Sequence, residues 1–168
     1  VTARHFTKYF KFPEDAPKEL VKFDFQRSGI FIFDAWVENS SGELTQTLHY
    51  GERAQFVLRV LALDAMCNSV NSGILFKSLS GLDLYGWSHA WCRNQYLKIN
   101  DNQMLELRFS IVVYLNDGTY FITYGLENAD GVTLDKHCDL TQITVVGGPK
   151  TYTTSLVNLD CSLTHKTM

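Results

Sequence analysis

The stretch from Gln103 to Asn128 constrains the fold of this chain more than any other. Its first half alternates strictly between an apolar set and a largely polar set, namely Leu105, Leu107, Phe109, Ile111, Val113 and Leu115 against Glu106, Arg108, Ser110 and Tyr114. A period of two is typical of a β-strand that buries one face. After Asn116-Asp117-Gly118, a run rich in aromatic and β-branched residues predicts a second strand.

The connection between these two strands predicts a corner rather than a simple hairpin. Gly118-x-Tyr120, directly after a strand that ends at Leu115, matches the tyrosine corner of immunoglobulin-like sandwiches, in which the Tyr hydroxyl bonds to backbone a few residues upstream. The two strands would then face each other across the core, in different sheets. On the second strand, Phe121, Thr123 and Gly125 would form a flat outward surface.

Turn signals separate further strands along the chain. We predict strands at 30–38, 53–63, 73–79, 82–89 and 138–146, an extended segment at 91–99, and a loop at 66–72. No segment has the pattern of an amphipathic helix, so the predicted fold is all-β: an antiparallel, immunoglobulin-like or jelly-roll-like β-sandwich. We assign residues 28–148 to this domain, 1–27 to a linker or N-terminal arm, and 149–168 to a C-terminal tail.

Composition excludes some classes of protein. The chain of 168 residues is 45% hydrophobic, which suits one globular domain. Its net charge of -3 gives no reason to expect nucleic acid, which usually needs a basic stripe. No apolar run approaches the roughly 20 residues that span a bilayer. The four cysteines include no CxxC pair, and we favour a reducing compartment.

The sequence contains no familiar catalytic motif. It has no GxSxG, P-loop, HExxH or Rossmann fingerprint, and its five histidines show no pair at metal-ligand spacing. His137-Cys138-Asp139 is not a metal site unless the strand bulges, because neighbours on a strand point to opposite faces. We therefore expect neither an enzyme nor a cofactor in this domain.

The segment 85–93 carries the binding hypothesis. If it stays extended, one outward face presents Tyr85, Trp87, His89, Trp91 and Arg93, with small residues on the core side. Aromatic rings with polar tips suit the C–H faces and hydroxyls of sugars, and an arginine fork suits a carboxylate or phosphate. Lys77 would lie nearby on the neighbouring strand, and Trp36 is a second outward aromatic. Alternatively, these aromatics pack under a loop, under the N-terminal arm or in a dimer interface.

The order of several short motifs is informative beyond each motif alone. They are Ser28-Gly29, then LHYGE at 48–52, SGILFK at 72–77, SGLDLYGWSH at 80–89 and LNDGTY at 115–120. In this order they resemble the C-terminal carbohydrate-binding domain of the nucleotide-binding subunit of O-antigen polysaccharide ABC transporters, the Wzt type. The resemblance covers about residues 28–148.

This resemblance implies a non-catalytic module whose outward, concave sheet face binds the modified non-reducing end of a finished O-antigen glycan and selects it for export. The modification would be a methyl group, a phosphate or an acidic sugar such as Kdo. It also implies a homodimer with an exchanged strand after Pro149, an ATPase domain before Val1, a membrane transporter subunit, and a cytoplasmic location at the inner membrane. The alternative function is a structural or adhesion-type sandwich whose aromatic stripe is a protein interface.

Overall fold

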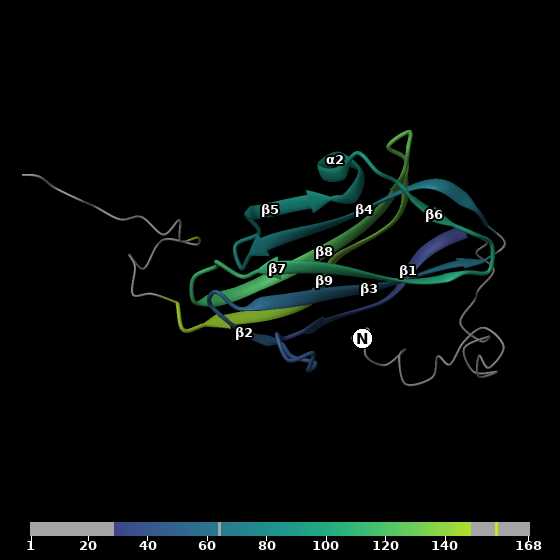
Figure 1. Ribbon diagram of the computed structural model, residues 1–168. Helices are drawn as coiled ribbons and strands as arrows, with labels where there is room; N and C mark the ends of the chain where they lie inside the picture. The colour runs from purple at the N-terminus through teal and green to yellow at the C-terminus, as the bar shows by residue number, and fades with distance from the viewer. Residues whose placement is uncertain (1–28, 64, 149–156, 158–168) are drawn as a thin grey trace, which may run out of the picture.

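The computed structural model describes residues 29–63, 65–148 and 157, and these form two sheets packed face to face (Figure 1). The three-stranded sheet has the order β1-β3-β7, with β1 at Gly29–Glu38, β3 at Arg53–Leu63 and β7 at Met104–Val112. The six-stranded sheet has the order β2-β9-β8-β4-β5, with β6 paired to β4. Its strands are β2 (Thr47–His49), β4 (Cys67–Ser78), β5 (Asp83–Ser88), β6 (Leu97–Ile99), β8 (Gly118–Asn128) and β9 (Thr133–Val146).

The predicted all-β sandwich is confirmed. Among the described strands every pairing is antiparallel except β2 with β9, which is parallel. The predicted arm at 1–27 lies outside the described residues. So does the predicted tail at 149–168, apart from Val157, which forms an isolated antiparallel bridge with Leu115. The assigned domain boundaries stay a prediction.

The core lies between the two sheets and follows from the period of two. Its fully buried side chains come chiefly from β3 and β8, including Phe56, Leu58, Val60, Ile122, Tyr124 and Leu126. Phe56 meets Phe76 of β4 edge to face, with ring centroids 5.0 Å apart. From β7, Phe109 reaches across to Tyr124, with centroids 6.5 Å apart. Such aromatic pairs add to the stabilisation from buried area alone.

The predicted tyrosine corner is confirmed. The strands on either side of it, β7 and β8, belong to different sheets. The Tyr120 hydroxyl donates a 2.7 Å hydrogen bond to the carbonyl oxygen of Asn116, and Tyr120 is buried. This bond holds the chain where it crosses the sandwich, so the two strands pack across the core as expected.

Two local predictions are wrong. The predicted loop at 66–72 is mostly the first half of β4, where buried Asn71 accepts a 2.9 Å hydrogen bond from the Ala90 backbone N–H. The predicted extended segment at 91–99 begins inside a single helical turn, α2 (His89–Arg93), so the strand before it ends at Ser88. Asn94 ends this turn in the left-handed conformation, with φ of 52°, which asparagine tolerates better than most residues.

Candidate functional site

The two sheets differ in width, and this leaves an opening along one edge of the sandwich. The edge strands there are β5 of the six-stranded sheet and β7 of the three-stranded sheet. Because the wider sheet extends past the narrower one, the inner face of β5 is only partly covered. Between β5, α2 and β7 lies a cavity of about 450 Å³, which we call the interlayer cleft. Its size is in the range of small-molecule sites.

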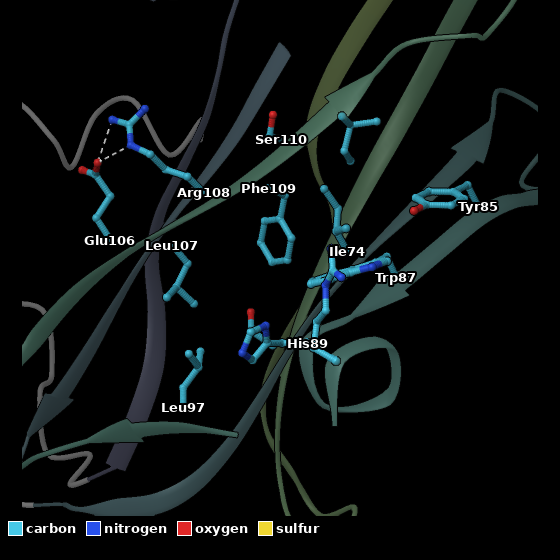
Figure 2. Close-up of a pocket in the computed structure, with 13 residues that line it drawn as sticks. Ile74, Tyr85, Trp87, His89, Leu97, Glu106, Leu107, Arg108, Phe109 and Ser110 are labelled. Carbon is cyan, nitrogen blue, oxygen red and sulfur yellow. Dashed lines mark hydrogen bonds and ion pairs between the residues drawn. The ribbon is translucent and has the colours of Figure 1, made fainter. Parts of the chain in front are cut away.

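Aromatic and polar side chains line the interlayer cleft (Figure 2). Figure 2 shows Leu107 and Phe109 projecting from β7 towards the side of the cleft that carries Trp87 and His89. The Trp87 indole meets the Phe109 ring edge to face, with centroids 5.8 Å apart, and the His89 ring lies 6.1 Å from Trp87. The floor therefore belongs to the core, while the mouth is open.

The aromatic residues of β5 point inward, contrary to the prediction. Trp87 pairs in register with Ile74, and Tyr85 with Phe76. Residues opposite each other on antiparallel strands project from the same face, and both β4 partners are buried in the core. The predicted inversion, with small residues inside, is therefore wrong: β5 keeps the usual pattern, and its inner side faces an open cleft.

The helical turn α2 divides the predicted stripe. His89 and Arg93 are four residues apart, so they lie on the same side of the turn, and both line the interlayer cleft. Trp91 lies out of phase with them, is 86% exposed, and lines a different depression on the outer face of the sheet. Lys77 also lies outside the cleft, with its amine 3.8 Å from the Asp139 carboxylate.

Of the six predicted site residues, the cleft thus brings together Tyr85, Trp87, His89 and Arg93 and leaves out Trp91 and Lys77. Trp36 also lies outside the interlayer cleft. Its indole N–H donates a 2.7 Å hydrogen bond to Glu38, and the Arg59 guanidinium lies 4.6 Å from its ring centroid. This tryptophan is part of a charged cluster on the three-stranded sheet.

Most charges beside the cleft are paired, but Arg93 is not. Arg108 lies 2.7 Å from both Glu38 and Glu106, and Glu106 also lies 3.2 Å from Arg59. Hydrogen bonds to the two carboxylates raise the pKa of Arg108, and its guanidinium lowers the pKa of Glu38. Within the described part of the chain, the Arg93 side chain makes no hydrogen bond or ion pair. The cleft therefore carries one uncompensated positive charge.

Sequence reasoning missed two kinds of cleft residue. Glu106, Arg108 and Ser110 form the polar phase of β7, and their spacing of two, which places them on one face of that strand, is the signal that groups them. Ser72 fell in the segment wrongly predicted as a loop. The residue lines the cleft, and its buried hydroxyl has no hydrogen-bond partner among the described residues. A buried hydroxyl without a partner is costly, so it is a natural contact for a ligand.

The described residues contain no group of three or more His, Cys, Asp and Glu side chains that could hold a metal ion. The strand does bulge at the His137-Cys138-Asp139 segment, where Asp139 has φ of 54°. His137 instead lies 3.1 Å from Asp135. Among all the residues that the structure describes, no helix has the length and apolar character needed to cross a membrane.

The chain matches the family model of the Wzt C-terminal domain over residues 24–159. The crystal structure of the C-terminal domain of Wzt has a TM-score of 0.75 at 23% identity, covering 83% of this chain and 86% of that one, which supports the sandwich fold. The CARDB domain of the PF1109 protein from Pyrococcus furiosus, in complex with di-metal ions, covers 70% of this chain and 86% of its own, with a TM-score of 0.42 and 11% identity. No curated protein sequence matches the chain. Because the family model spans most of its length, the chain belongs to the Wzt C-terminal domain family.

Proposed function

We propose that this domain is a non-catalytic carbohydrate-binding module that holds the modified non-reducing terminus of an O-antigen polysaccharide in the interlayer cleft. Binding there would select the finished glycan for export by an ABC transporter. Membership of the Wzt C-terminal domain family supports the link to O-antigen export. The observation that carries the position of the site is the unpaired Arg93, which lines the same cleft as the Trp87 indole.

The cleft offers the contacts that a sugar residue needs. The half-buried indole of Trp87 and the exposed ring of Tyr85 present apolar surface to sugar C–H groups. His89 and the unpartnered Ser72 hydroxyl offer hydrogen bonds to sugar hydroxyls. A few fixed polar groups among aliphatic and aromatic side chains are typical of small-molecule sites.

The unpaired charge favours an anionic terminal group over a methyl group. Glu106 on the opposite wall is already compensated by Arg59 and Arg108, so it does not repel an anion strongly. Arg93 is free to bind a carboxylate or phosphate through two parallel hydrogen bonds. On this reading the terminal modification is a phosphate or an acidic sugar.

Calorimetric titration with terminal oligosaccharides, released from the lipopolysaccharide of the source strain, tests this proposal. We expect Trp87→Phe and Arg93→Gln each to weaken binding about tenfold, because each removes one aromatic or charge-assisted contact. Arg93→Gln should also flatten the dependence of affinity on salt. Lys98→Gln, at an exposed position of β6 outside the cleft lining, is the matched charge control.

Ser72→Ala separates binding from folding. The wild-type hydroxyl has no hydrogen-bond partner, so its removal should leave thermal stability equal or higher while it lowers the affinity for the oligosaccharide. Wild-type affinity in Trp87→Phe, Arg93→Gln and Ser72→Ala together would place the glycan site elsewhere. A wild-type chain that binds no oligosaccharide but assembles through Trp87 would favour the protein-interface alternative.

In this account the domain acts as a homodimer at the cytoplasmic side of the inner membrane, beside an ATPase domain and a membrane transporter subunit. Light scattering of the purified 168-residue chain tests the assembly. The expected mass is that of two chains, and the mass of one chain at micromolar concentration would argue against the dimer.

A further inference from the structure

The outer face of the six-stranded sheet carries a second depression, of about 480 Å³, which we call the glycine groove. Its floor crosses three adjacent strands and contains one glycine from each: Gly86 of β5, Gly73 of β4 and Gly125 of β8. Gly73 and Gly125 are opposite each other in the β4–β8 pair. The groove lies on the side of β5 opposite the interlayer cleft, and Trp87 lines both.

The backbone does not require glycine at these positions. The glycines with positive φ among the described residues are at 29, 42, 51, 81, 131 and 147, so none belongs to this floor. A Cβ on Gly125 would meet nothing within 4 Å, and a Cβ on Gly86 would make only an ordinary contact with Leu75, at 3.6 Å. A Cβ on Gly73 would make a tighter contact, 3.3 Å from the backbone oxygen of Trp87.

Glycine inside a strand is unfavourable, by roughly 0.5–1 kcal/mol relative to alanine. Where neither backbone conformation nor packing demands it, a strand glycine can mark a place where a ligand or another backbone approaches closely. Two of the three floor glycines, Gly86 and Gly125, meet that condition. Their effect is a flat sheet surface that another flat molecule can approach.

An exposed tryptophan stands beside this floor. Trp91 of α2 is 86% exposed, and its ring makes no aromatic or hydrogen-bond contact within the described part of the chain. The remaining walls carry groups suited to hydroxyls, including Ser88, Glu127 and Lys136. With one acid and one base, these walls carry no net charge, unlike the interlayer cleft. A free indole over a flat, polar-rimmed floor favours stacking of a neutral sugar ring.

We propose that the glycine groove is a second carbohydrate subsite, which holds neutral internal sugars of the glycan whose terminus occupies the interlayer cleft. This inference rests on the proposed function. The two sites adjoin through β5 and α2: Trp87 lines both, α2 contributes His89 and Arg93 to the cleft, and it contributes Trp91 to the groove. A glycan chain that passes the end of β5 at Ser88 can therefore contact both.

The test compares two probes purified from the same lipopolysaccharide: the terminal mono- or disaccharide, and a longer fragment that adds several repeat units. Gly125→Val fills the groove from an extended, unobstructed position, and Trp91→Ala removes an exposed ring. We expect each variant to bind the longer fragment about tenfold more weakly than the wild type does and to bind the terminal fragment with unchanged affinity. Leu79→Ala, another exposed apolar side chain, is the control and should change neither affinity.

The outcomes separate this inference from the proposed function. Wild-type affinity of Gly125→Val and Trp91→Ala for the longer fragment overturns the second subsite and leaves the cleft intact. Loss of the longer fragment in these two variants, with no effect of Arg93→Gln on either probe, supports the groove and overturns the cleft. If the wild-type chain binds neither probe, both fail. Chemical shifts of backbone amides show that each variant remains folded.

Discussion

The buried carboxyl group of Asp34 makes the stability of this domain depend on pH. Asp34 is 2% exposed in β1, and its Oδ2 has no hydrogen-bond partner among the described residues. Burial raises the pKa of Asp34 from 3.8 to about 6, while the Ala35 backbone N–H and the charge of Arg59 lower it by less. Between these values the folded chain holds a proton that the unfolded chain has released, so stability falls as pH rises.

We predict that Asp34→Asn stabilises the domain at neutral pH. A pKa rise from 3.8 to about 6 corresponds to about 3 kcal/mol of destabilisation by the ionised group. The protonated carboxyl and the amide each leave one buried polar atom without a partner, so that cost, roughly 1 kcal/mol, is common to both chains. The net gain at pH 7 is therefore about 3 kcal/mol. Below about pH 4 both side chains are neutral, and the two chains should be almost equally stable.

Urea unfolding at several pH values between about 4 and 7 measures this difference directly. The free-energy curves of wild type and Asp34→Asn should separate as pH rises and become parallel above the raised pKa of Asp34. Asp130→Asn, at an exposed turn, is the matched control and should follow the wild type. Parallel curves over the whole range, or a less stable Asp34→Asn chain at pH 7, would refute the reasoning.

Two smaller effects follow from other contacts. Tyr120→Phe removes the 2.7 Å hydrogen bond to the Asn116 carbonyl and should destabilise the fold by about 1–2 kcal/mol in urea unfolding. Tyr114→Phe, at an exposed ring, is the control and should change little. Equal stability of the two variants would contradict a structural role for the tyrosine corner. The hydrogen bond to Asp135 raises the pKa of His137 in the folded chain, although partial burial lowers it. The pair therefore stabilises the fold below the ordinary pKa of histidine in the unfolded chain, and this contribution is lost as pH rises through the raised pKa of the folded chain. His137→Gln should remove this pH dependence, which is worth less than about 1 kcal/mol because the ring is half exposed. If the slope of unfolding free energy against pH between about pH 6 and 8 is the same in the variant and the wild type, this role of the pair is refuted.

Much of the fold is readable from local patterns. The alternation along 105–115 reflects a strand with one buried face, and the Gly118-x-Tyr120 motif carries its own hydrogen bond to Asn116. Both signals are short-range, which is why the strands and the corner were predicted correctly. The segment 66–72 was predicted wrongly because its residues favour turns locally, whereas long-range pairing with β8 makes most of it a strand and the Ala90 backbone N–H satisfies Asn71.

The site was only partly predictable, for the same reason. The structure brings Tyr85, Trp87, His89 and Arg93 to one cleft, but neither the inward direction of the β5 side chains nor the helical turn that leaves out Trp91 was predicted. The role of these four residues in binding stays a prediction. Whether an edge strand faces a closed core or an open cleft depends on how many strands the opposite sheet has. That number comes from long-range pairing, which local spacing does not contain.

The proposed function requires that the glycan terminus bind in the interlayer cleft. A crystal structure of the chain with its terminal oligosaccharide bound tests this most directly. We expect the terminal sugar to lie against the Trp87 indole, with its anionic group within hydrogen-bond distance of Arg93 and a hydroxyl hydrogen-bonded to Ser72. A terminal sugar bound on any other surface, with the cleft lined only by its own side chains, would contradict it.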